Sequence, residues 1–395
     1  MQAVYTHEEA PNSFEKSLFL AGPTPRSKDV DSWRPGALKI LEELEYDGVV
    51  FVPEFRDGNI IDTFDPDWYK KQCDWEHSKL NMSDYAVFWV PRNLVTLPAF
   101  TTNVEFGLLA RSRKAIFGSP VPVAEYKNRY LQYCAEKFGI PQTETLRDTL
   151  QKAVACIGAG ALRFGGERNI PIFLWCAPHF QEWYQSQRAV GNYLNEAEVL
   201  FMPQTGSTDK VFYWAVHANI HIASEDRDKK NKSEIIFSRW NISSIVLYRK
   251  TDNFMDTEVV LVREFRSPMN NSSGFIWELP GGSSPDFSLS PLQIAEEEVW
   301  EEVGLKIDPD RFVPHGSRQL MGTMSAHKAN LFSVELTEEE LAWLKTQKGI
   351  ARGVSLHDPS GERAYTEIKM VYEIIAEDLV DWSNVGMIMA ALQEE

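Results

Sequence analysis

Cysteine is scarce in this sequence: there are four among 395 residues, and none lies in a Cys-x-x-Cys pair. The four are Cys73, Cys134, Cys156 and Cys176, and their spacing is irregular. A disulfide framework or a structural zinc site needs closely grouped cysteines, so the sequence favours neither. We expect free thiols, which are typical of a reducing compartment.

Long apolar segments are also missing. No run approaches the roughly 20 apolar residues with which a helix spans a bilayer. The first 16 residues are polar and on balance acidic, without the basic start and apolar centre of a signal peptide. The sequence therefore predicts a cytoplasmic protein with no membrane partner, and a loose tail over residues 1–16.

Positive charge is in deficit. Lys and Arg total 40 against 57 Asp and Glu, which gives a formal net charge of −17. Binding to nucleic acid or to anionic lipid needs clustered Lys and Arg, so we expect neither partner. A single nucleotide is still compatible with this charge, because a divalent cation can bridge its phosphates to carboxylates.

Short apolar runs alternate with helical patterns in the first half of the chain. Strands are predicted over residues 17–21, 48–53, 85–90 and 114–118, and helices over 33–46, 104–113 and most of 125–163. Strands that alternate with helices indicate a parallel sheet with right-handed crossovers. We therefore predict an α/β domain over residues 1–163.

The pattern changes in the second half. β-branched and aromatic residues predict strands over residues 211–222, 234–249 and 258–265. A Gly-rich turn, an acidic helix and further strand-like segments follow. We predict a second domain, of α+β type, over residues 208–395. Residues 164–207, which are rich in aromatic side chains, are predicted to be a packed connector.

Polar residues gather where the strands of the first domain are expected to end. Open parallel sheets bind ligands beyond the carboxyl ends of their strands. Glu105 is expected in the first turn of its helix, where the helix dipole favours an ionised carboxylate. Such a carboxylate can attack an anomeric carbon, although an ordinary first-turn glutamate is the alternative. The other residues of this region are Gly22, Pro23 and Thr24, then Glu54, then Thr101, Thr102 and Asn103, any of which can cap the helix.

These segments resemble the nucleoside 2-deoxyribosyltransferase-like family over about residues 17–150. The matching residues are 19–23 (Phe-Leu-Ala-Gly-Pro), Trp33, Trp75, Glu76, Ser83, Asp84 and 102–107 (Thr-Asn-Val-Glu-Phe-Gly). The resemblance implies a flavodoxin-like parallel sheet in which Glu105 attacks the sugar and Glu76 or Asp84 binds sugar and base. Gly22, Pro23, Thr24, Thr102 and Asn103 would then contact the substrate. Better-known members have an aspartate six residues before the nucleophile, where this sequence has Ala99. Related folds often build their sites across subunits, so the sequence leaves open whether the protein is a monomer or a homo-oligomer.

An acidic helix carries the most specific motif of the second half. Glu298, Glu301 and Glu302 stand at i, i+3 and i+4, which places three carboxylates on one face of a helix over residues 291–303. Like charges repel there, and a divalent cation would turn that repulsion into coordination. Gly304 is expected to end the helix as its C-terminal cap. The alternative is a solvated acidic helix.

Together with Gly282, residues 298–305 resemble the Nudix box, within a context that resembles ADP-ribose and nucleoside-diphosphate-sugar pyrophosphatases. The resemblance implies an α+β fold whose mixed sheet lies in an α/β/α sandwich. It also implies that Glu298, Glu301 and Glu302 bind Mg²⁺ or Mn²⁺ while water attacks a diphosphate, with Glu302 among the catalytic residues. Glu367 is a weaker candidate for a base or ligand.

The Nudix-like segment departs from the family pattern. Glu297 stands where the family has an arginine that orients the metal-binding glutamates, and Ser288 or Leu289 stands where it has a further glutamate. Arg263 or Arg266 could replace that arginine in space, and Arg266 is also a candidate substrate contact.

Taken together, the two resemblances imply a bifunctional enzyme of nucleoside or nucleotide metabolism. One domain would cleave or transfer an N-glycosidic bond, and the other would hydrolyse a diphosphate such as that of NAD or ADP-ribose. An alternative is a Nudix-like domain that binds a nucleotide without cleaving it and regulates the first domain. A third reading, an inactive scaffold, is disfavoured by the retained glutamates.

Overall fold

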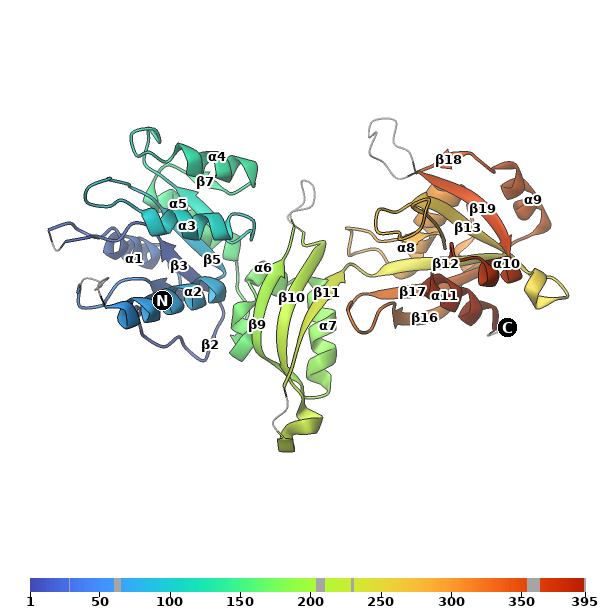
Figure 1. Cartoon of the computed structure of the whole chain (residues 1–395), viewed down its shortest axis with the longest axis horizontal. Coiled ribbons are helices and arrows are strands. Elements are labelled where there is room, and N and C mark those ends of the chain that lie inside the picture. The colour runs from blue at the N-terminus through green and yellow to red at the C-terminus, as the bar shows by residue number, and fades with distance from the viewer. Residues whose placement is uncertain (28, 60–64, 204–209, 229–230, 354–362, 394–395) are drawn as a thin grey trace. The chain divides into compact units, whose positions relative to one another are not determined.

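The computed structural model describes residues 1–27, 29–59, 65–203, 210–228, 231–353 and 363–393. The chain forms two compact units, Met1–Ser238 and Arg239–Glu395 (Figure 1). The two-domain layout expected from the sequence is therefore present, but the division lies at Ser238 and residues 208–238 belong to the first unit. No helix among the described residues is long and apolar enough to cross a membrane.

A parallel sheet of six strands forms the centre of the first unit. The strands are β1 (Gln2–Tyr5), β3 (Ser17–Ala21), β4 (Val49–Val52), β5 (Tyr85–Trp89), β6 (Ala115–Gly118) and β7 (Gln142–Thr143), in the order β1-β4-β3-β5-β6-β7. Without β1, this is the doubly wound order 2-1-3-4-5, whose switch point lies between β3 and β5. The loose tail expected over residues 1–16 is wrong, because β1 pairs in parallel with β4 at the sheet edge.

Helices cover both faces of this sheet. On one face α1 (Arg34–Glu43) and α5 (Leu146–Ile157) bury Ala37, Leu41 and Leu150 against the strands. On the other face lie α2 (Pro66–Met82), α3 (Phe100–Leu109) and α4 (Arg129–Lys137). Each face of the sheet has its own hydrophobic core. Successive side chains of a strand point to opposite faces, so Leu18 and Phe19 of β3 belong to different cores.

The rest of the first unit is an antiparallel sheet with a short helical layer. The sheet has the order β11-β10-β9, from β9 (Tyr193–Phe201), β10 (Tyr213–His221) and β11 (Asn231–Arg239). Helix α7 (Pro178–Ala189) packs Phe180 and Trp183 against Trp214 of β10, with ring centroids 5.3 and 5.6 Å apart. Smaller elements are the β2–β8 pair (Ser13–Phe14, Arg163–Phe164), η1 (Gly165–Asn169), α6 (Ile172–Trp175) and η2 (Ala223–Asp228). Of the expected connector over residues 164–207, the described part, residues 164–203, lies inside this unit and contains helices and strand β9.

A mixed sheet forms the centre of the second unit. Its main path is β16-β17-β12-β13-β19-β18, in which β12 and β17 are parallel and the other pairs are antiparallel; β14 pairs with β13 and β15 with β12. The strands are β12 (Ile242–Arg249), β13 (Glu258–Phe265), β14 (Phe275–Glu278), β15 (Gly281–Gly282), β16 (Val313–Gln319), β17 (Lys328–Glu335), β18 (Ala351–Arg352) and β19 (Ala364–Met370).

Both faces of the mixed sheet are also covered. Ile245 and Leu247 of β12 point to a core shared with α8 (Pro291–Glu298), the π-helix η4 (Val299–Val303) and α9 (Glu338–Thr346). Val246 and Tyr248 point to a second core with α10 (Val371–Ala376) and α11 (Trp382–Gln393). Two short 3-10 turns, η3 (Phe254–Asp256) and η5 (Pro309–Arg311), complete the unit. The expected mixed sheet between two helical layers is therefore what this unit forms.

Candidate functional site

The loop after β3 lies at the switch point of the parallel sheet. Gly22 has φ +152°, and a Cβ at this position would lie 2.3 Å from the backbone oxygen of Trp89, at the end of β5. Only glycine allows the two strand ends to approach this closely. The Pro23 carbonyl accepts a hydrogen bond of 3.1 Å from the Trp33 indole, which holds the loop against α1.

Arg34, the first residue of α1, organises the same strand ends. Its side chain is 1% exposed, and its guanidinium donates to the Leu20 and Gly22 carbonyls at 3.0 and 2.9 Å. It also donates to the Thr24 hydroxyl at 3.1 Å and forms an ion pair of 2.5 Å with Glu54. Our reading of the sequence did not single out Arg34. The sequence feature that could have identified it is an arginine at the first position of a helix whose other buried residues, Ala37 and Leu41, are apolar.

Glu105 lies in the second turn of its helix and not in the first. Helix α3 begins at Phe100, with Ala99 as its N-cap in a left-handed conformation and no side-chain cap. The capping roles expected for Thr101, Thr102 and Asn103 are therefore wrong: Thr102 is buried, and Asn103 accepts a hydrogen bond from Arg92. The expected stabilisation of ionised Glu105 by the helix dipole is wrong as well, because that effect is confined to the first turn.

Burial instead makes Glu105 reluctant to ionise. Its side chain is 8% exposed, and burial together with the nearby Glu76 carboxylate raises its pKa to about 8, against a smaller opposing effect of Arg34. Burial also raises the pKa of Glu76, which accepts a hydrogen bond of 2.7 Å from Gln72. Two carboxyl groups and one arginine thus share a poorly solvated region beneath α2 and α3.

Asp84 does not join this group. It precedes β5, at the amino end of the sheet, and is fully buried. Its carboxylate pairs with Arg163 at 2.6 and 2.8 Å and also accepts from the backbone of Ser17 and Ile172, both at 2.8 Å. In this geometry the carboxylate joins residues far apart in the chain, which is a structural role, and its binding of sugar or base stays a prediction.

The cavity that contains Glu105 in its wall also differs from expectation. It has a volume of about 850 Å³. Glu105 is one of the wall residues. Most of the other wall residues contributed by the parallel sheet and its helices lie near the C-terminal ends of α2, α3 and α4 and near the start of β6. These positions are at the amino end of the sheet. We expected a pocket beyond the carboxyl ends, where Gly22, Thr24 and Glu54 lie.

In the second unit, two glycines and two glutamates form a tight contact. A Glu302 carboxylate oxygen accepts from the Gly281 amide at 2.9 Å. A Cβ on Gly282 would lie 2.2 Å from a Glu298 carboxylate oxygen. Burial, followed by the charges of Glu298, Glu278 and Glu264, raises the pKa of Glu302 well above its usual range.

The three glutamates of the acidic helix do not share one face as expected. From Val299 the helix continues as a π-helix, closed by a Gly304 to Val299 hydrogen bond of 3.0 Å. This wider turn changes the angular offset between successive side chains, and Glu301 is exposed while Glu298 and Glu302 are partly buried. Gly304, with φ +80°, caps the helix as predicted.

Arginines from β13 and the loop after it meet the same acidic region. Arg266 forms ion pairs of 2.8 Å with Glu264 and 2.7 Å with Glu278, both of which raise the pKa of Glu302. Arg263 instead lies over the rings of Phe275 and Tyr365 and contacts Glu367 at 3.6 Å. Of the two arginines proposed to replace the family arginine, Arg266 is the one joined to the carboxylate cluster.

Metal binding is not evident from side-chain spacing alone. Within the described ranges, no group of three or more His, Cys, Asp or Glu side chains is arranged to hold a metal ion. Glu298 and Glu302 are oxygen donors of the kind that Mg²⁺ and Mn²⁺ take, but Glu301 points to solvent.

Comparison with known proteins bears mainly on the first unit. No curated protein matches the sequence. One solved structure, described as the crystal structure of an ADP compounds hydrolase, aligns with 50% of this chain and 93% of its own, at 11% identity and a TM-score of 0.32. Residues 15–122, which include Gly22, Arg34, Glu76 and Glu105, match the family model of nucleoside 2-deoxyribosyltransferase-like proteins.

Proposed function

We propose that the first unit cleaves or transfers the N-glycosidic bond of a nucleoside or nucleotide, with Glu105 as the attacking group. The observation that carries the proposal is the pair of poorly solvated carboxyl groups, Glu105 and Glu76, inside the segment that matches the family model. A buried carboxyl group with a strongly raised pKa is destabilising, and such groups are concentrated at functional sites.

Burial raises the pKa of both carboxyl groups, and the charge of Glu76 raises that of Glu105 further, so simultaneous ionisation of the two is unfavourable. Two coupled carboxyl groups titrate as a unit, so the proton is shared between them. In the arrangement that we propose to react, Glu105 is ionised and Glu76 carries the proton. Glu105 then has the electron pair needed for attack, and Glu76 has the proton that a departing base requires.

The reaction proceeds in two balanced steps. A Glu105 oxygen bonds to the anomeric carbon while the carbon–nitrogen bond breaks, its electron pair going to the base and the Glu76 proton following. Water or a second base then bonds to the same carbon, releasing Glu105 as a carboxylate and returning a proton to Glu76. Water gives hydrolysis, and a second base gives transfer.

The test is base release from a panel of nucleosides and nucleotides, identified by mass. Glu105→Gln should lower release by roughly a thousandfold or more, because a glutamine side chain cannot attack the sugar as a carboxylate does. Glu136→Gln, on the exposed surface of α4, is the matched control and should not change it. Unchanged release in Glu105→Gln would show that the chemistry lies elsewhere.

For the second unit, we propose metal-dependent hydrolysis of a nucleotide diphosphate. The supporting observation is the crowding of Glu264, Glu278, Glu298 and Glu302, to which Arg266 contributes a positive charge through its ion pairs with Glu264 and Glu278. Mg²⁺ or Mn²⁺ would be held by Glu298 and Glu302, with Glu301 turning inward, and would supply the positive charge that stabilises a diphosphate under attack. The alternative is a nucleotide sensor that does not cleave its ligand.

Glu297→Arg separates these possibilities. If the missing arginine limits the site, this variant should raise Mg²⁺ affinity, by about 10-fold or more as for other groups that orient metal ligands, and increase monophosphate production with it. Binding of nucleotide without cleavage in both proteins would favour the sensor. If neither metal nor nucleotide binds in calorimetry, the glutamates are a solvated helix face.

A further inference from the structure

A second feature of the first unit is the chemistry of the 850 Å³ cavity at the amino end of its parallel sheet. This volume is within the usual range for small-molecule sites, about 300–1,000 Å³. Its walls come from α2, α3, the turn before β6, the end of α4 and strand β9. Gly22 and Glu54, at the carboxyl ends of the strands, are not among the lining residues, whereas Glu105, the proposed attacking group, is one of them.

Basic side chains dominate the charged part of the lining. They are Arg111, Arg113, Lys114 and Lys137, with His77 beside them, against the carboxyl groups of Glu105 and Glu198. Over the whole chain the balance is reversed, at 40 Lys and Arg against 57 Asp and Glu. At neutral pH Glu105 retains its proton for most of the time, because its pKa is about 8. The cavity is therefore a positive region in an acidic protein.

Lys114 is the most constrained of these cations. It is 5% exposed, and its ammonium donates to the backbone oxygens of Leu80 and Asn81 at 2.7 and 2.8 Å. An ammonium has three donors, and neither partner is charged. Burial lowers the pKa of Lys114 to about 7, so an anion in the cavity would favour its charged form.

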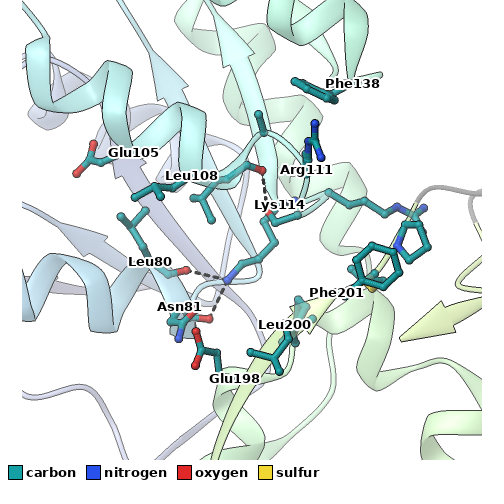
Figure 2. A pocket seen from close by; sticks show the side chains of 18 of the residues that line it. Leu80, Asn81, Glu105, Leu108, Arg111, Lys114, Phe138, Glu198, Leu200 and Phe201 are labelled. Carbon is teal, nitrogen blue, oxygen red and sulfur yellow. Dashed lines mark hydrogen bonds between the residues drawn. The ribbon is translucent and has the colours of Figure 1, made fainter. Parts of the chain in front are cut away.

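The remaining wall is apolar. Leu108 of α3 is 65% exposed, and Leu200 and Phe201 of β9 are 45% and 55% exposed. Figure 2 shows Lys114 reaching toward Leu80 and Asn81, with Leu200 and Phe201 across from it and Arg111 beside Phe138. The Arg111 guanidinium lies 5.2 Å from the Phe138 ring centroid. Apolar side chains and cations therefore line the same space.

We propose that this cavity binds a small phosphorylated ligand with an aromatic body, of the nucleoside monophosphate class. The arginines and lysines suit a phosphate, which accepts several charge-assisted hydrogen bonds, and the leucines and Phe201 suit a base. Because Glu105 lies in the wall of this cavity, the proposal rests in part on the proposed function, but binding and cleavage of the ligand are measured separately.

Calorimetric titration of the full chain at neutral pH tests the proposal. The probes are the monophosphates of adenosine and cytidine, the two parent nucleosides and inorganic phosphate. Arg111→Gln combined with Lys137→Gln removes two exposed cations from the lining. Lys39→Gln combined with Lys152→Gln removes the same charge from α1 and α5, on the other face of the sheet, and is the control.

At least one monophosphate should bind more tightly than its nucleoside and than phosphate. The cavity variant should lose at least about tenfold of that affinity, since bonds to charged groups are the strong ones, and the control should lose little. Equal affinity for nucleoside and monophosphate, no binding, or equal losses in both variants would overturn the proposal. Mass analysis after each titration shows whether the ligand was cleaved, which separates failure of binding from failure of the chemistry.

Discussion

Replacing Glu105 by glutamine should stabilise the first unit, and the gain should depend on pH. In the unfolded chain Glu105 ionises near 4.5, whereas in the folded protein burial and Glu76 raise its pKa to about 8. Between these values the unfolded chain releases a proton that the folded chain keeps, so rising pH favours unfolding. Glutamine has nearly the same shape as glutamate but cannot ionise, so the variant does not lose stability from this source as pH rises.

The magnitude follows from the two pKa values. Each pH unit between them corresponds to about 1.4 kcal/mol. Relative to Glu105→Gln, the wild type should therefore lose roughly 3 kcal/mol by pH 7 and roughly 5 kcal/mol above pH 8, and nothing from this source below pH 4.5. These are large fractions of the stability of a typical domain.

Urea unfolding followed by tryptophan fluorescence, at about pH 5 and about pH 8.5, measures the difference. The transition belonging to the first unit can be assigned by hydrogen exchange in α3. Glu136→Gln, an exposed change on α4, should behave as wild type at both values. A gain for Glu105→Gln that is equal at the two pH values would refute the reasoning, because it would not come from ionisation.

Three further predictions follow from the same geometry. The rate of base release should fall at low pH, where both Glu76 and Glu105 are protonated, and again as pH rises through about 8, where the pair loses its proton; a pH–rate profile checks this. Asp84→Asn should destabilise the first unit by about 3 kcal/mol or more, measured by urea unfolding, because it leaves the buried Arg163 without its counter-charge. Gly22→Ala should cost about 1–3 kcal/mol in the same assay, since its Cβ would overlap the Trp89 carbonyl, whereas Gly36→Ala, which meets nothing within 4 Å, is the control.

Local patterns in the sequence were sufficient for much of the fold. Strands β3, β4, β5 and β6 are within a residue or two of the predicted ranges, because a short run of apolar residues between turn signals has few other solutions. Strand β1 was missed because its four residues, Gln2–Tyr5, carry no such signal and become a strand only by pairing with β4, more than 40 positions away. The Gly304 cap was also predictable, because a helix C-cap depends on one residue and its sequence neighbours.

The environment of each side chain was decided by tertiary structure. Glu105 could be singled out from its motif, but its raised pKa depends on Glu76 from another helix and on burial by the surrounding core. The sequence pattern suggested Asp84 as a ligand-binding carboxylate, and only the fold shows that it pairs with Arg163, 79 positions later. The sequence by itself determined which residues could carry charge and where short elements begin and end. Only the packed fold determined which charged side chains are desolvated and which form ion pairs. Both depend on distances between segments that are remote along the chain.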